Sequence, residues 1–153
     1  MRDRPPPASG LRPRRETPTG LRETHARDPP THRDLIDSPH TATLSTVGAD
    51  GIPQVTALWY LAEKDSIAIS VPADRQKYKN VVAHPKATLF VIDPANPFRT
   101  LEIRGTTSTE PDSDLELFER VVRHYGHDPA AFPAGDADRV ALRLIPIRVV
   151  AQG

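Results

Sequence analysis

The strongest constraint on the fold is a series of short β-rich segments separated by turn signals. Residues 41–46 (TATLST) and 53–61 (PQVTALWYL) flank a turn that contains Asp50-Gly51, a pattern typical of a β-hairpin. Pro146 lies inside the last β-rich segment and predicts a sheet edge or a bulge there. The remaining strands are predicted at residues 66–71, 87–92, 98–110 and 139–151.

Two helices are predicted between these strands. The first covers residues 75–83, with Tyr78, Val81 and Val82 as its buried stripe, and the second covers residues 112–126. Three residues at the start of the second helix are candidate caps: Asp112, Ser113 and Asp114. Six strands joined mostly by tight turns predict a mainly β, α+β fold with a small antiparallel sheet or barrel.

The first 34 residues differ in composition from the rest of the chain. They contain seven of the 17 prolines and eight arginines against five acids, with few apolar residues. Such a segment cannot bury enough apolar surface to offset its ordering entropy. We therefore expect a disordered tail over residues 1–34 and one folded domain over residues 35–153.

Composition also excludes several classes of protein. The net charge is zero, which does not favour nucleic acid or an acidic membrane surface as a partner. The chain has no cysteine and no apolar run near the ~18 residues of a membrane span. The histidines show no metal-ligand spacing, so no metal site is predicted. Without a signal peptide, the expected location is the cytoplasm.

The segment ADRQKYKN, residues 73–80, places three cations at a helix start. Arg75, Lys77 and Lys79 oppose the helix dipole there, at a cost of roughly 0.3–1 kcal/mol each. An anion held by these side chains and the free N–H groups would explain them, and Asn80 adds an amide donor one turn later. A solvated basic face explains the same pattern equally well.

The only tryptophan, Trp59, is followed by Tyr60 on a predicted strand. Successive side chains point to opposite faces of a strand, so only one of the two rings can face the core. An exposed ring would serve as a ligand platform or an interface. Burial of Trp59 in the core is an equally good interpretation.

Several motifs together resemble a known family. They are HTATLSTVGADGIPQVTALWYL, RQKYKN, HPKATLFVIDPANPFRTLEIRG and DRVALRLIPIRVVA. The chain resembles the pyridoxamine 5'-phosphate oxidase-like split β-barrel proteins over about residues 35–151. Within that family it is similar to the group of oxidoreductases that use the deazaflavin coenzyme F-420. The family's N-terminal helix is longer, whereas only residues 32–39 match it here.

The resemblance implies a six-stranded FMN-binding type split barrel that forms a homodimer, with cofactor clefts at the subunit interface. It implies that Arg75, Lys77 and Asn80 hold the cofactor phosphate. The residues from Gln54 to Trp59 would border the ring, and the loop that contains Phe98 would lie near the cleft of its own chain or of the partner chain. Lys79 and Lys86 extend the basic surface toward the anionic tail of F-420.

The implied activity is hydride transfer between F-420 and a small unsaturated molecule, because the cofactor supplies the reactivity. No catalytic residue is assigned; Tyr60 is a candidate proton donor only if it faces the cleft. FMN is the alternative cofactor. A flavin- or deazaflavin-binding protein without turnover, and a nucleic-acid module that acts through the basic tail, are the alternative functions.

Overall fold

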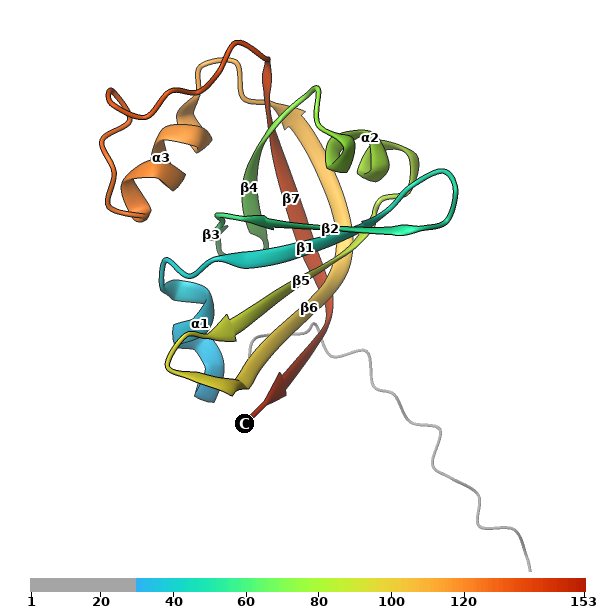
Figure 1. The fold of residues 1–153 in the computed structure, drawn as a ribbon, viewed down its shortest axis with the longest axis vertical. Helices are drawn as coiled ribbons and strands as arrows, with labels where there is room; N and C mark the ends of the chain where they lie inside the picture. Colours follow the sequence, from blue (N-terminus) through green and yellow to red (C-terminus); the bar gives the residue numbers. More distant parts are fainter. Residues whose placement is uncertain (1–29) are drawn as a thin grey trace, which may run out of the picture.

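A computed structural model describes residues 30–153 (Figure 1). Its strands are β1 (Ala42–Val47), β2 (Pro53–Leu58), β3 (Leu61–Ala62), β4 (Ile67–Pro72), β5 (Lys86–Asp93), β6 (Asn96–Pro111) and β7 (Arg139–Gln152). Its helices are the 3-10 turn η1 (Pro30–His32), α1 (Arg33–Asp37), α2 (Gln76–Ala83) and α3 (Glu116–His124).

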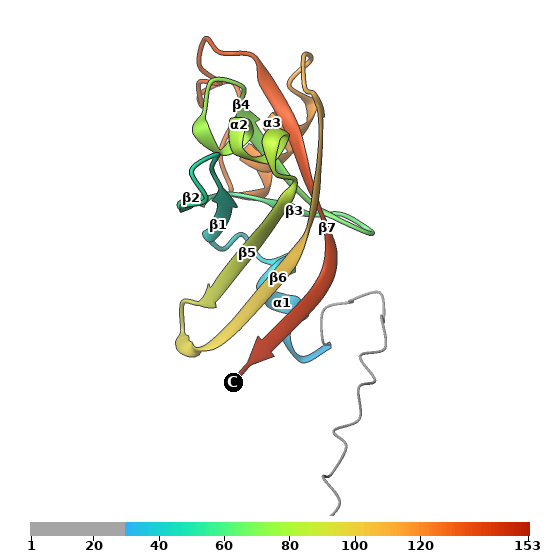
Figure 2. The same ribbon diagram turned by 90° about the vertical axis from the view of Figure 1, so that its right-hand side faces the viewer.

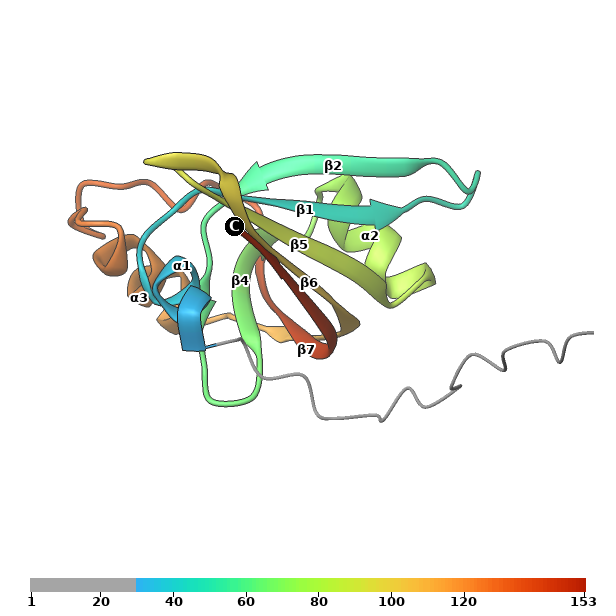
Figure 3. The same ribbon diagram turned by 90° about the horizontal axis from the view of Figure 1, so that it is seen from below.

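The strands form one antiparallel sheet in the order β2-β1-β5-β6-β7-β4-β3. The sheet coils strongly: β1 and β2 run across Figure 1, whereas β4 and β7 run from top to bottom, and Figures 2 and 3 show the coil from the side and from below. Leu44, Leu89, Ile103 and Leu142 belong to the main core and have no exposed surface. This arrangement confirms the predicted mainly β, split-barrel architecture.

The strand count differs from the prediction, because residues 53–61 form two strands and not one. β2 pairs with β1 at one edge of the sheet, while β3 pairs with β4 at the opposite edge. Trp59 and Tyr60 lie where the chain crosses between the edges. Tyr60 is fully buried, and its hydroxyl donates to the carbonyl oxygen of Leu35 at 2.7 Å, which fixes the crossing.

The N-terminal helices close one end of the barrel. Leu35 and Ile36 of α1 are buried in the main core, and buried His32 donates from Nε2 to the Gln152 carbonyl oxygen at 2.9 Å. The boundary predicted between residues 34 and 35 therefore falls inside α1. Residues 1–29, which hold most of the predicted tail, lie outside the described range.

A bulge shapes the centre of the sheet at Gly105. The register between β6 and β7 shifts between Arg104 and Gly105, and Pro146 lies opposite Gly105. A Cβ atom on Gly105 would lie 2.1 Å from the carbonyl oxygen of Ile145, so only glycine fits there. Both interpretations of Pro146 hold: it lies at the bulge, and it lies beyond Leu144, the last residue of β7 that pairs with β4, so that this part of β7 has a partner strand on one side only.

Candidate functional site

The first turn of α2 carries positive charge that only one weak ion pair offsets. Arg75 has extended backbone angles at the N-cap position and makes no side-chain cap, and the first turn has no acidic residue. Among residues 30–153, the backbone N–H groups of Gln76 and Lys77 donate to no acceptor. The turn therefore combines free backbone donors with two cationic side chains, the arrangement that binds phosphate groups.

Arg75 and Lys77 differ in their surroundings. Arg75 is exposed and lies 3.8 Å from Asp74, which is a weak surface pair. Lys77 is half-buried and has no ion pair in the described part of the chain. Burial lowers the pKa of Lys77 below its usual value, and the nearby charge of Arg75 lowers it further. An anion bound here would relieve both effects.

Asn80 lies behind this turn, toward the sheet, and is 3 % exposed. Its Nδ2 donates to Thr46 Oγ1 at 3.0 Å and to Gln54 Oε1 at 3.1 Å. Its Oδ1 accepts from Gln76 Nε2 at 2.8 Å. Asn80 thus links α2 to β1 and β2 through side-chain hydrogen bonds, and both of its polar side-chain atoms are already used. Val82, predicted to be buried, is 62 % exposed, because Asn80 and not Val82 faces the sheet.

β2 contributes two polar side chains near Asn80. Gln54 and Thr56 alternate with the exposed residues Pro53, Val55 and Ala57, so they share the inner face of the strand. The buried Oγ1 of Thr56 has no hydrogen-bond partner within residues 30–153. Since Gln54 Oε1 accepts from Asn80, the Nε2 group of Gln54 remains as a donor. Gln54 thus lies next to the α2 site, and its contact with a cofactor ring stays a prediction.

Trp59 lies elsewhere. Its ring stacks on Tyr125 at 4.5 Å and on His127 at 5.3 Å between ring centres, within a cluster around α3. Trp59 follows Gln54 by five residues, about 17 Å along a strand. Of the two interpretations of Trp59, packing in an apolar cluster fits its position. Tyr60 points into the core and donates to a backbone carbonyl, so it does not face a cleft as a proton donor.

The turn between β5 and β6 lies at the opposite end of the molecule from α2 (Figures 1 and 2), and Phe98 is the third residue of β6, next to this turn. The last residues of the α2 segment contact β6 at Thr107, whose N–H donates to the Pro85 carbonyl oxygen at 2.6 Å. Nine residues of strand, roughly 30 Å, separate Thr107 from Phe98. Phe98 is 82 % exposed, so within one chain it takes no part in the α2 site.

The remaining predicted contact, Lys79, lies on the solvent side of α2. Its side chain is exposed, as is that of Lys86 at the start of β5. No ion pair involves either lysine within the described residues. Both side chains are thus exposed cations beyond the first turn, and their role toward a cofactor tail stays a prediction.

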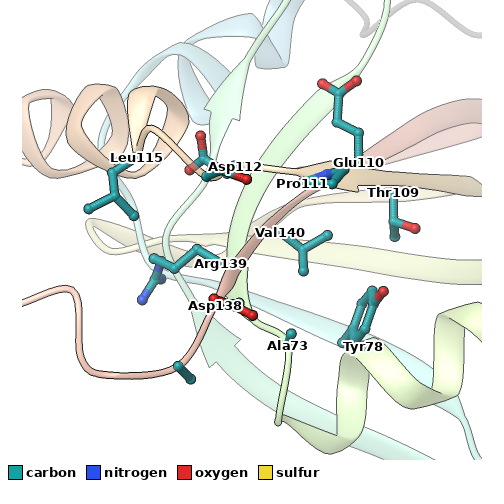
Figure 4. Close-up of a pocket in the computed structure, with 12 residues that line it drawn as sticks. Ala73, Tyr78, Thr109, Glu110, Pro111, Asp112, Leu115, Asp138, Arg139 and Val140 are labelled. Atoms are coloured by element: carbon teal, nitrogen blue, oxygen red, sulfur yellow. The ribbon is translucent and has the colours of Figure 1, made fainter.

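A pocket of about 560 Å³ lies on the other side of α2 (Figure 4). Tyr78 faces the strand end that bears Thr109, while Asp112, Asp138 and Arg139 line the rest. Two of these charges already have partners: Asp112 caps α3 by accepting from Leu117 N at 3.1 Å and Phe118 N at 3.0 Å, and Arg139 donates from Nε to Ser70 Oγ at 2.9 Å. The pocket has acidic walls and is a poor site for an anion. Of the three candidate caps, Asp112 accepts two N–H groups of α3, and Asp114 Oδ1 accepts a longer one from Glu116 N at 3.4 Å.

Sequence analysis missed two residues that hold Asn80 in place, Thr46 and Gln76, whereas Thr56 falls inside the predicted range from Gln54 to Trp59. The strand alternation of residues 41–46 could have placed Thr46 on the inner face, and the four-residue spacing could have paired Gln76 with Asn80. Only the three-dimensional structure brings both side chains to β2. Within residues 30–153, no cluster of three or more His, Asp or Glu side chains could hold a metal ion, and no helix has the length and apolarity needed to cross a membrane.

Comparison with known proteins identifies the family. Residues 29–153 match the family model described as pyridoxamine 5'-phosphate oxidase. The protein therefore belongs to the pyridoxamine 5'-phosphate oxidase family, and the resemblance inferred from the sequence is confirmed. No curated protein sequence matches the chain.

Solved structures support the same assignment. A protein named F-420 reductase is 33 % identical, with a TM-score of 0.75, over 80 % of this chain and 98 % of that one. The hypothetical protein Rv2991 from Mycobacterium tuberculosis is 24 % identical, with a TM-score of 0.66, over 88 % of this chain and 89 % of that one. HutZ, a heme storage protein from Vibrio cholerae, is 20 % identical, with a TM-score of 0.60, over 81 % and 94 % of the chains. The last two share the fold alone.

Proposed function

We propose that this protein is an oxidoreductase that transfers a hydride between the deazaflavin coenzyme F-420 and a small unsaturated organic molecule in the cytoplasm. The observation that carries the proposal is the first turn of α2, where free N–H groups and two cations have no anionic partner except the weak contact of Arg75 with Asp74. The 33 % identity to a protein named F-420 reductase supports the choice of cofactor.

The residues at this site fit a phosphate-bearing, flavin-like cofactor. Arg75, Lys77 and the free N–H groups of α2 would hold the phosphate through charge-assisted hydrogen bonds. The amide of Gln54 and the buried hydroxyl of Thr56 would meet polar atoms of the ring, and the unpartnered Thr56 Oγ1 gains a partner in this way. The bound deazaflavin supplies the hydride chemistry.

The choice between F-420 and FMN rests on surface charge. Both cofactors present a phosphate, so Arg75 and Lys77 do not distinguish them. F-420 continues into a chain of carboxylates, whereas FMN ends at the phosphate. Lys79 and Lys86 are exposed cations without ion pairs among the described residues, and they would meet that longer anionic tail. Solvent supplies any proton, because Tyr60 is occupied in the core.

We also propose that the protein works as a homodimer. Large apolar side chains remain exposed on the sheet and its hairpins: Val47, Ile52, Val55, Ile92, Phe98, Ile145 and Ile147. Exposed apolar side chains in this number favour an interface over isolated surface residues. In such a dimer, Phe98 of one protomer could reach the α2 site of the other, which it cannot do within its own chain.

Titration of the purified protein with F-420 and with FMN tests the cofactor. F-420 should bind more tightly than FMN at low salt. The difference should shrink at 0.15 M salt, because exposed charges are then screened within about 8 Å. Tighter binding of FMN at both salt concentrations would make this an FMN-dependent protein instead.

Turnover needs a second experiment. The F-420 complex should exchange hydride with at least one member of a panel of small unsaturated acceptors, followed by the absorbance of the cofactor. Binding of F-420 without oxidation or reduction by any acceptor would instead support a carrier or sensor. The variant Arg75→Ala/Lys77→Ala is the matched control, since it should lose both binding and turnover.

A further inference from the structure

The side-chain hydrogen bonds of Asn80 form a chain in which each donor and each acceptor is defined. Gln76 Nε2 donates to Asn80 Oδ1, and Asn80 Nδ2 then donates to Gln54 Oε1. A side-chain amide has one acceptor end and one donor end. Because the acceptor end of Gln54 is held by Asn80, its Nε2 group remains as a donor with no partner among the described residues.

Asn80 itself cannot serve as a ligand of the phosphate in this arrangement. Its side chain is 3 % exposed, and both its oxygen and its nitrogen are in hydrogen bonds with Gln76, Thr46 and Gln54. Contact with an anion would take at least one N–H of Nδ2 away from Thr46 or Gln54, and that acceptor would then lose its partner.

We infer that Asn80 is a positioning residue that fixes Gln54 as a hydrogen-bond donor toward an acceptor atom of the cofactor ring, such as a ring carbonyl oxygen. This inference rests on the proposed function, because it concerns the same site. It separates the motif R-x-K-x-x-N into two roles. Arg75 and Lys77 hold the phosphate, while Asn80 acts on the ring side of the site through Gln54.

The test compares FMN with riboflavin, which has the same ring and lacks the phosphate. Dissociation constants are measured from the quenching of flavin fluorescence on the full-length protein, with thermal unfolding of each variant in parallel. Asn80→Asp has almost the same shape but offers acceptors only. It forces Gln54 to donate inward and to turn its oxygen toward the ring, so riboflavin affinity should fall about tenfold.

A second variant replaces the donor nitrogen of Gln54 with an acceptor oxygen. Gln54→Glu keeps the acceptor for Asn80 but presents a carboxylate oxygen to the ring, so it should also weaken riboflavin binding at least tenfold. Asn80→Asp and Gln54→Ala should be strongly non-additive, since both act on one interaction. Thr43→Val, on the same strand β1 but outside the hydrogen bonds of Asn80, is the matched control and should leave riboflavin affinity unchanged.

Each outcome distinguishes one explanation. If Asn80→Asp weakens FMN but leaves riboflavin binding intact, Asn80 acts on the phosphate and the inference is wrong. Normal riboflavin affinity in Gln54→Glu would also overturn it, because the outward atom would then not need to donate. If wild-type protein binds neither flavin nor F-420, the proposed function fails instead, which is a different result.

Discussion

At the scale of single residues, Arg75 and Lys77 make the clearest prediction. Each would form a charge-assisted hydrogen bond with the cofactor phosphate, worth roughly 1.5–3 kcal/mol. Arg75→Ala and Lys77→Ala should each weaken binding of F-420 about ten- to a hundredfold in fluorescence titrations. Thermal stability without cofactor should not fall, because each change removes a cation from the positive end of a helix. Normal F-420 affinity in both variants would show that this turn is only a solvated basic face.

Lys77 also makes the stability of the cofactor-free protein depend on pH. Burial and Arg75 lower its pKa in the folded state from the unfolded value of 10.5. The unfolded chain then binds the proton more tightly, so the contribution of Lys77 to stability rises as pH increases toward 10.5. The measurement is the free energy of unfolding of wild type minus that of Lys77→Met across pH 7–11.

The difference between wild type and Lys77→Met is needed because another group, Tyr125, titrates in a similar pH range. Burial raises the pKa of Tyr125 to about 12, so its contribution to stability is present below pH 10 and is lost as pH rises from about 10 to 12. Tyr125 is the same in both proteins and cancels. A flat difference curve would show that Lys77 is not desolvated.

Sequence patterns could find the charges of the site but not its hydrogen bonds. Three cations at a helix start stand out by type and spacing, so Arg75 and Lys77 were predictable. The role of Asn80 depends on two strands that precede it by more than 20 residues. Trp59 was ambiguous, because alternation on a strand leaves either face open until the crossing of Tyr60 into the core is known.

At the scale of elements, the bulge between β6 and β7 should depend on Gly105. A Cβ atom there would lie 2.1 Å from a backbone oxygen, which no side-chain movement can relieve. Gly105→Ala should therefore lower the free energy of unfolding by about 3 kcal/mol, measured by urea denaturation. Ser108→Ala, at an exposed position of the same strand, is the control. Equal stability of the two variants would contradict this account of the bulge.

The attachment of α3 gives a second prediction at this scale. Trp59 packs with Tyr125 and His127 and joins the strand crossing to the helix. Trp59→Ala should lower the free energy of unfolding by about 3 kcal/mol, while Trp59→Phe should lower it by less. F-420 affinity should stay within twofold in both. A large loss of F-420 affinity with little loss of stability would show that Trp59 belongs to the cofactor site.

The positions of most elements could be predicted, whereas their partners could not. Alternation and turn signals placed the hairpin of β1 and β2 and the long strands β6 and β7 within a few residues. They could not split residues 53–61, because the change of partner from β1 to β4 occurs inside a continuous β-rich run. The apolar side chain of Val82 predicted burial, but the hydrogen bonds of Asn80 decide which face of α2 meets the sheet.

At the scale of the whole molecule, the exposed apolar side chains should bring two chains together. Light scattering on the full-length protein should give twice the chain mass of 16.9 kDa. Val55→Arg places a charge on an exposed strand position and should yield monomers that keep their circular dichroism spectrum and bind F-420 more weakly. Ala131→Arg, in the loop after α3, is the control and should remain dimeric. A wild-type monomer at micromolar concentration would contradict the proposed dimer.

The hydrogen bond between His32 and Gln152 joins the first helices to the last strand, so both ends of the described domain lie side by side. Arg99 strengthens this closure, since it donates to Asp34 at 2.8 Å and to the Thr31 carbonyl oxygen at 2.6 Å. The order of the helices and strands along the chain could therefore be changed without changing their arrangement in space. A circular permutant, with residues 30 and 152 joined by a short glycine-serine linker, could open in the loop after α3. Because the joined ends lie at the opposite end of the molecule from α2, the permutant should keep its affinity for F-420.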